Sequence, residues 1–404
     1  MYDACLVRDP IFDRSSALIG YEIRFRDTEE GRAALTQSML SGTFDIVRGG
    51  LPAFIACSRS QLLEQAFAGT DPKSLVLLLA DNIGEEPEVL AALQKLRAAG
   101  GRFALDNLDE TPSTGEKLGR WMEFARVDLR LDDQKVVAAI CARMAVPKPR
   151  FIADQVLDAA QYAMAVKLGF DAFQGPHFSR TETIPTAQMP ASTAAALRLL
   201  SLARDPNISD RALEEAVSTD PVLTFQLLRL VNSAAVGVKG VSSIGHALRI
   251  IGRTAFLRWL ALAIAASRGA KTGVDQHLVR QAVERGRLLE QLSGQGRDAG
   301  TLFLVGLFSL MDSVFRMPLH DIVARVALGD DAKAALLDRT GPYAKALSFA
   351  ESYELGMFES ALEAAREMGV NADKLPELYA TAISWTAEAL GAMTKQPERK
   401  LATR

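Results

Sequence analysis

The chain has 404 residues, of which 49% are hydrophobic and 24% charged, a balance typical of a globular protein with room for two or three domains. Its net charge of −3 argues against a strongly basic nucleic-acid-binding protein. The three cysteines are scattered, which excludes a disulfide framework and favours a reducing compartment. No apolar stretch has the length of a membrane span. We therefore expect a cytoplasmic protein that contacts neither nucleic acid nor membrane directly.

Short β-type segments alternate with helical patterns through the first 180 residues. The patterns predict strands at residues 4–7, 20–25, 53–57, 75–80, 103–105, 125–129, 151–154 and 172–174. The run at 75–80 is unbroken and apolar, as in a buried strand, and Pro87 is placed to open the helix that follows. Repeated alternation of this kind predicts a (β/α)8-type barrel or, failing that, a doubly wound sheet.

Polar side chains stand where several of these strands end. Asp81, Asp106 and Asn107 follow apolar strand residues, and Glu22 lies within a predicted strand, which is unusual unless the carboxylate faces solvent or a site. The carboxyl ends of barrel strands face the ligand site. Asp and Asn are equally common as ordinary turn residues, so the positions alone do not establish a site.

The first half resembles an EAL domain, the barrel that in its active form hydrolyses cyclic di-GMP to linear pGpG with two divalent metal ions. The segments that carry the resemblance are DPIFD, GYEIRFR, LVLLLADN, GRFALDNL, ARVDL, FIADQVLD and LGFDAFQGPHFSR, in this order over residues 1–180. The resemblance assigns the signature carboxylate to Glu22 and the phosphate-holding arginine to Arg26. It assigns the remaining polar positions of the site to Asp106, Asn107, Asp154 and Gln174.

Several positions depart from the EAL pattern. Ala56 and Leu78 replace a metal-binding Asn and a Glu, Asn107 replaces an Asp, and Arg126 replaces a Lys. A pair of dications needs several anionic oxygens to offset its repulsion. We therefore expect no catalytic residues and no metal cofactor, with Mg²⁺ or Mn²⁺ bound only if the chain hydrolyses cyclic di-GMP. A weak single-metal site is left open at the three surviving carboxylates, Glu22, Asp106 and Asp154.

The second half is predicted to be helical throughout. Residues 181–191 carry two prolines and little apolar periodicity, so we place a linker there, between a barrel domain at 1–180 and a helical domain at 192–404. The segments STDPVLTFQLLRLVNSA and GVSSIGHALRIIGRTAFLRW resemble the HDOD domain, an all-helical relative of HD phosphohydrolases that generally lacks their metal ligands. At the matching positions we expect Asn232 and Ser233 to form hydrogen bonds across a helix end and Gly252 to permit a close turn.

The two resemblances imply a bacterial signalling protein with a degenerate active site. Our first expectation is a non-catalytic regulator, not an enzyme, that acts through protein partners, with self-association into a homodimer left open. The first alternative is a cyclic di-GMP receptor without hydrolysis, in which Arg26 contacts a phosphate. The second alternative is a weak cyclic di-GMP phosphodiesterase.

Overall fold

The computed structural model describes residues 5–26, 28–64, 66–67, 70–80, 82–108, 114–131, 133–144, 148–179, 191–205, 207–268, 272–293, 298–326 and 328–394. The chain divides into two compact units. The first comprises Met1–Thr181, Thr272–His277 and Glu351–Ala380, and the second comprises Glu182–Lys271, Leu278–Ala350 and Thr381–Arg404. The expected linker at 181–191 falls almost wholly outside the described residues, as does Asp81, so the proposed domain boundaries stay a prediction.

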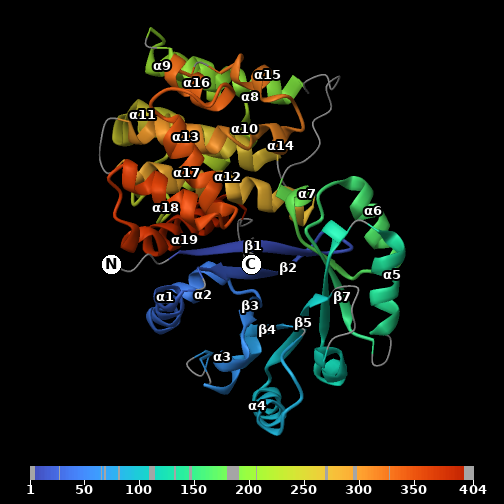
Figure 1. Ribbon diagram of the computed structural model, residues 1–404. Helices are drawn as coiled ribbons and strands as arrows, with labels where there is room; N and C mark the ends of the chain where they lie inside the picture. Colours follow the sequence, from blue (N-terminus) through green and yellow to red (C-terminus); the bar gives the residue numbers. More distant parts are fainter. Residues whose placement is uncertain are drawn as a thin grey trace, which may run out of the picture. The chain divides into compact units, whose positions relative to one another are not determined.

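Eight strands of the first unit close into a barrel (Figure 1). Strands that follow one another in the chain are neighbours in the barrel, and β1 also pairs with β8. Strand β1 is antiparallel to both of its neighbours, whereas all the other pairs are parallel. The barrel prediction is thus confirmed over the doubly wound sheet. The strands are β1 (Leu6–Asp13), β2 (Leu18–Phe25), β3 (Ala53–Cys57), β4 (Leu75–Ala80), β5 (Arg102–Leu108), β6 (Phe124–Asp128), β7 (Arg150–Asp154) and β8 (Ala172–Phe173).

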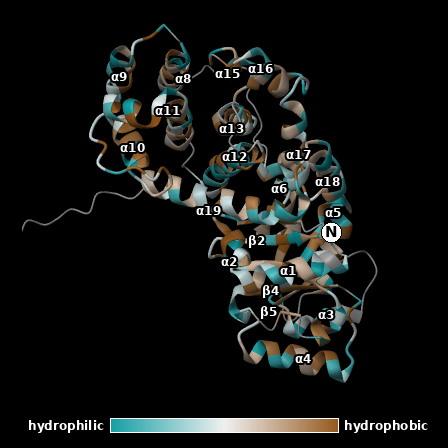
Figure 2. Cartoon of the chain, turned by 90° about the vertical axis from the view of Figure 1, so that its left-hand side faces the viewer, coloured by the Kyte–Doolittle hydropathy of each residue, from teal (hydrophilic) through white to brown (hydrophobic). Residues whose placement is uncertain are grey.

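Helices on the outside of the barrel connect the strands. Helix α4 begins at Pro87, as expected, and turns Val89 and Leu93 inward; Figure 2 shows hydrophobic and hydrophilic residues on this helix. The helices of this region are α1 (Glu29–Ser41), α2 (Thr43–Arg48), α3 (Arg59–Leu63), α4 (Pro87–Ala98), α5 (Gln134–Arg143), α6 (Ala159–Leu168) and α7 (Pro176–Ser179), with 3₁₀ turns at Pro72–Ser74, Thr114–Trp121 and Leu129–Leu131.

The barrel interior is filled with side chains. The Phe54 and Phe124 rings meet edge to face, with centroids 5.3 Å apart. Because the interior is packed, polar side chains can gather only at an end of the barrel. The buried cluster that forms this core comprises Ile11, Phe54, Val76, Leu78, Ala104, Phe124, Ile152 and Ala172.

A C-terminal segment, Glu351–Ala380, belongs to the first unit and is held on β1 by Tyr353. The buried Tyr353 hydroxyl donates to the Leu6 carbonyl oxygen at 3.0 Å and lies 3.3 Å from the Leu6 amide nitrogen, which donates to it. The Tyr353 ring packs against Phe358 and Tyr379. Tyr353 stands near the end of α17 (Ala344–Glu354), and α18 (Phe358–Glu367), a 3₁₀ turn (Ala372–Lys374) and α19 (Leu375–Thr394) follow.

The second unit consists of helices over the residues described. Ser209 caps α9, and Asp220 caps α10 with Pro221 in its first turn. The longest helix, α11, is interrupted at Gly252, whose φ of 75° is left-handed, in line with the expected turn. The remaining helices are α8 (Ala191–Arg204), α9 (Asp210–Ser218), α10 (Pro221–Val231), α11 (Ile244–Arg268), α12 (Gly273–Leu292), α13 (Ala299–Phe308), α14 (Met311–Phe315), α15 (Leu319–Val323) and α16 (Asp330–Leu337).

Asn232 forms the hydrogen bonds expected across the end of α10. Its side-chain amide donates to the carbonyls of Leu228 and Val241, and its oxygen accepts from the Val241 amide, each at 2.8 Å. The Ser233 hydroxyl is buried and has no such bond in the described part of the chain, so that expectation is wrong for Ser233. Among the described residues, no helix combines the length and the apolar composition needed to cross a membrane.

Replacement of Tyr353 by Phe should loosen the C-terminal segment from β1. Loss of the hydroxyl leaves two buried Leu6 backbone groups with one partner fewer, which we expect to cost about 1–2 kcal/mol. All three cysteines lie within Met1–Thr181, and Cys5 is buried beside Leu6. Thiol labelling of Cys5 during urea titration therefore measures the change. Tyr162→Phe is the control, and equal shifts in both variants would contradict the role of Tyr353.

Candidate functional site

A cavity of about 670 Å³ opens at the carboxyl ends of β2 to β5. Glu22, Arg24 and Arg26 line it from β2 and the residue just after it, and Asp106 lines it from β5. Ala56 and Leu78, the two positions that depart from the EAL pattern by losing an oxygen ligand, also line it. The outer wall comes from residues 356–360 of the C-terminal segment. The cavity thus combines acidic, basic and apolar groups within the first unit.

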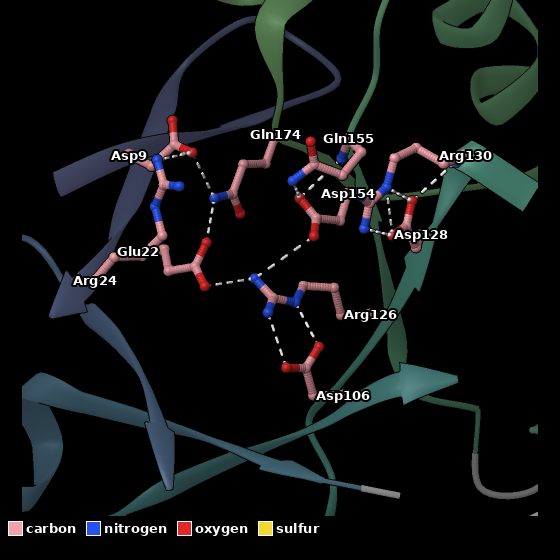
Figure 3. A network of polar contacts seen from close by, with 10 residues as sticks. All are labelled: Asp9, Glu22, Arg24, Asp106, Arg126, Asp128, Arg130, Asp154, Gln155 and Gln174. Atoms are coloured by element: carbon pink, nitrogen blue, oxygen red, sulfur yellow. Dashed lines mark hydrogen bonds and ion pairs between the residues drawn. The ribbon is translucent and has the colours of Figure 1, made fainter. Parts of the chain in front are cut away.

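The guanidinium of Arg126 lies at the centre of the polar side chains (Figure 3). It forms a bidentate pair with Asp106, with Nε 2.6 Å from Oδ1 and Nη2 2.8 Å from Oδ2. Its Nη1 lies 2.8 Å from Glu22 Oε1 and 3.8 Å from Asp154 Oδ2. Burial alone would lower the pKa of Arg126, but the carboxylates of Glu22 and Asp106 raise it well above its ordinary value. Arg126 is therefore a permanent positive charge among three carboxylates.

Gln174 continues the network toward β1. Its amide nitrogen donates to Glu22 Oε2 at 2.5 Å and to Asp9 Oδ2 at 3.2 Å, and Arg24 Nη2 donates to the same Asp9 oxygen at 3.1 Å. The register of β1 and β2 places Asp9 opposite Glu22. Gly175, with φ of 136°, brings the chain so close to Val156 that a Cβ would lie 2.4 Å from the Val156 nitrogen. Only glycine fits there, and this close approach fixes the backbone of Gln174.

Carboxylates outnumber guanidinium groups in this network. Burial raises the pKa of Asp154 to about 6, although Arg126 acts in the opposite direction. Burial likewise raises the pKa of Asp9. Burial would also raise the pKa of Glu22, but Arg126 and Arg24 hold it below its ordinary value. Among the carboxylates drawn in Figure 3, Asp9 and Asp154 therefore hold their protons more readily than isolated carboxyls would, whereas Glu22 does not.

The pair of metal ions that an EAL-type barrel implies does not fit this arrangement. The three carboxylates that could serve as ligands converge on the Arg126 guanidinium, and an ion there would meet a fixed positive charge. Within the described ranges, no three His, Cys, Asp or Glu side chains are grouped so that they could hold a metal ion. The weak single-metal site at Glu22, Asp106 and Asp154 stays a prediction, as does the expected absence of catalytic residues.

The structure brings together most of the side chains that the sequence singled out. Glu22, Asp106, Asp154 and Gln174 share one network, and Arg26 lies in the same cavity. The side chain of Asn107 is outside the described residues, although its backbone belongs to β5. Sequence reasoning missed Asp9, because it lies beyond the strand predicted at residues 4–7 and only the register of β1 places it opposite Glu22. It also missed residues 356–360, which are remote in the sequence.

Comparisons with known proteins found one family match, two relatives along most of the chain and several solved structures similar to its barrel. Residues 189–317 match the HDOD domain. The chain is 23% identical to YuxH of Bacillus subtilis (strain 168), over 94% of this chain and 97% of that protein. It is also 23% identical to a Vibrio cholerae protein named cyclic di-GMP phosphodiesterase CdgJ, over 96% of this chain and 93% of that protein. The solved structure of Bacillus subtilis YkuI, with an EAL domain, c-di-GMP and calcium, is 16% identical, covers 43% of this chain and 54% of that chain, and has a TM-score of 0.36.

These comparisons correct one expectation. We expected that the chain is not an enzyme, but a relative aligned along 96% of it is named as a cyclic di-GMP phosphodiesterase, and nothing in the structure shows that activity is lost. That expectation is therefore wrong as stated. The N-terminal barrel resembles EAL domain structures, and the C-terminal half carries an HDOD domain.

Proposed function

We propose that this protein is a cytoplasmic signalling protein that binds cyclic di-GMP at the mouth of its barrel and responds through protein partners. The observation that carries the proposal is the pair of arginines that line the cavity, Arg24 in β2 and Arg26 just after it. Guanidinium groups suit the phosphodiester groups of a cyclic dinucleotide because they donate two parallel hydrogen bonds. The volume of about 670 Å³ falls in the range of small-ligand sites, about 300–1,000 Å³.

Arg126 supports a site that works without a resident metal cofactor. Its guanidinium neutralises carboxylates at the place where a family enzyme would carry cations, and its bidentate pair with Asp106 fixes the side chains around it. We assign the binding of protein partners to the HDOD half, where Val222 and Phe225 of α10 are exposed. A homodimer stays a prediction, and light scattering of the purified chain measures it.

Asp154 favours hydrolysis of cyclic di-GMP as a second candidate function. Its pKa of about 6 is close to the pH at which a general base works best, because it can then both accept and release a proton. Asp154 ends β7 and lies beside the Arg126 guanidinium. In this candidate Asp154 would take a proton from the attacking water, and the named relative in Vibrio cholerae supports the same reaction class.

Replacement of Arg26 by Ala should weaken cyclic di-GMP binding by at least about tenfold, since hydrogen bonds to a charged group contribute about 1.5–3 kcal/mol. Calorimetry with cyclic di-GMP measures binding, and pGpG release with Mg²⁺ or Mn²⁺ is followed on the same samples. Arg48→Ala, which removes an ion-paired arginine of α2, is the control. Product release would select the second candidate, and absence of both binding and product in the unaltered chain would contradict both.

Replacement of Arg126 by Ala should leave three carboxylates without their shared cation. We expect a loss of about 3–5 kcal/mol in unfolding free energy near pH 8, the usual result when one partner of a buried ion pair is removed. Labelling of buried Cys57 during urea titration measures it. Millimolar Mn²⁺ should restore part of the loss in this variant and have little effect on the unaltered chain. If the variant is as stable as the parent, Arg126 is not the neutralising charge.

Replacement of Asp154 by Asn should change how stability depends on pH. The pKa of Asp154 is raised from 3.8 to about 6 in the folded chain. Between about pH 4 and 6 the unfolded chain has lost this proton while the folded chain keeps it, so unfolding free energy falls as pH rises. The variant has no carboxyl at this position and does not lose this stability. Its unfolding free energy should exceed that of the parent by about 2–3 kcal/mol above pH 7 and equal it near pH 4.

The same Cys57 labelling, repeated from pH 4 to pH 8, measures this difference. Because the labelling rate itself depends on pH, each variant is compared with the parent at the same pH. Asp45→Asn, which removes an exposed carboxylate of α2, should follow the parent profile. A constant offset between Asp154→Asn and the parent across the range would show that Asp154 does not hold its proton abnormally.

A further inference from the structure

The turn between α17 and α18 lies against the arginine wall of the cavity. Arg24 Nη1 donates to the Leu355 carbonyl oxygen at 3.0 Å. The next residue, Gly356, has φ of 70°, and a Cβ built on it would lie 2.9 Å from Arg24 Nη1. The left-handed backbone favours glycine at this position, and the Arg24 guanidinium fills the space where a side chain would begin. The hydrogen bonds of Tyr353 to Leu6 hold the start of this turn on the barrel.

Glu359 places a carboxylate on the second arginine of the cavity. Its Oε1 lies 2.5 Å from Arg26 Nη2. It stands in the first turn of α18, where a negative charge is favoured by the helix dipole. The Glu359 side chain is 77% exposed and that of Arg26 is 26% exposed. A solvated pair of this kind contributes only about 0.2–1 kcal/mol, so another anion can replace the carboxylate.

We propose that Glu359 occupies the anion position of Arg26 when nucleotide is absent, and that a phosphodiester group of cyclic di-GMP displaces it. This inference rests on the proposed function, because it names how the same site is regulated. Both anions would approach the same guanidinium from the cavity, and the repulsion between their negative charges makes them compete for Arg26. Displacement of Glu359 releases one of the contacts that hold the turn of residues 355–360, and nucleotide binding therefore loosens this turn from the arginine wall.

The turn of residues 355–360 also carries two apolar side chains that line the cavity. Met357 and Phe358 line the cavity beside Glu359, and Met357 is half exposed. Aromatic side chains such as Phe358 are common partners for the flat faces of nucleobases. The wall formed by residues 356–360 thus presents a competing charge and an apolar contact side by side.

Replacement of Glu359 by Gln tests the competition directly, because it keeps the size of the side chain and removes its charge. We expect cyclic di-GMP to bind about two- to fivefold more tightly, the fold-change that corresponds to a solvated ion pair. Glu363→Gln, one turn further along α18 and also exposed, is the matched control and should leave affinity unchanged. In a chain that already carries Arg26→Ala, the change at Glu359 should have no effect.

Hydrogen exchange of the full chain gives a second measurement. Saturating cyclic di-GMP should raise the exchange of peptides covering residues 355–360 in the parent, and Glu359→Gln should show raised exchange before nucleotide is added. If the parent and Glu359→Gln bind with equal affinity and exchange is unchanged, the competition is disproved while the proposed function stands. If neither chain binds cyclic di-GMP, the proposed function fails and this inference fails with it. Tighter binding that persists in the Arg26→Ala background would also overturn the competition.

Discussion

A guanidinium group buried among carboxylates organises the mouth of this barrel. Arg126 is held from two sides by Asp106 and Glu22. The free-energy cost of burying these charges is offset only because each group finds a partner of opposite charge in good geometry. The orientation of Glu22 then determines where its other oxygen meets Gln174, and Gln174 in turn meets Asp9. One ion pair between β5 and β6 thus sets the positions of side chains on β1, β2 and the end of β8.

The network ends at Arg24 of β2, and Arg26 follows just after the strand. These two arginines are less buried than Arg126. Arg24 is shared between Asp9 and the Leu355 carbonyl, so it belongs partly to the buried network and partly to the turn beside it. Arg26 lies beyond the network and pairs with a solvent-exposed carboxylate. The buried charged groups are held in place by their partners, whereas the exposed partner of Arg26 can be exchanged for another anion. The site therefore combines a buried, mostly acidic part, which its ion pairs hold in place, with a basic residue, Arg26, whose exposed partner can change.

The sequence was sufficient to predict the barrel, because buried strands at regular intervals and polar residues at their ends leave few alternatives. The strand-end argument pointed to Asp106, and the resemblance to EAL domains added Glu22, Asp154 and Gln174 to the same site. It placed β1 only at residues 4–7, whereas β1 runs to Asp13 through Pro10, because the proline reads locally as a turn. Glu359 could not be found at all, because its partner Arg26 is more than 300 residues away and no local pattern marks a contact of that range.

An arginine in place of exchangeable cations changes what can control the site. A bound ion can leave, so a metal site responds to the concentration of that ion, whereas Arg126 is covalently part of the chain and keeps its charge at every physiological pH. The charge that holds Asp106 and Glu22 in place is consequently present whatever the concentration of metal ions. The variable part, in the proposed competition, is the anion on Arg26, which is either the carboxylate of Glu359 or a phosphodiester group of the ligand. In the proposed competition, control of the site therefore lies with the turn of residues 355–360, whose Glu359 carboxylate pairs with Arg26.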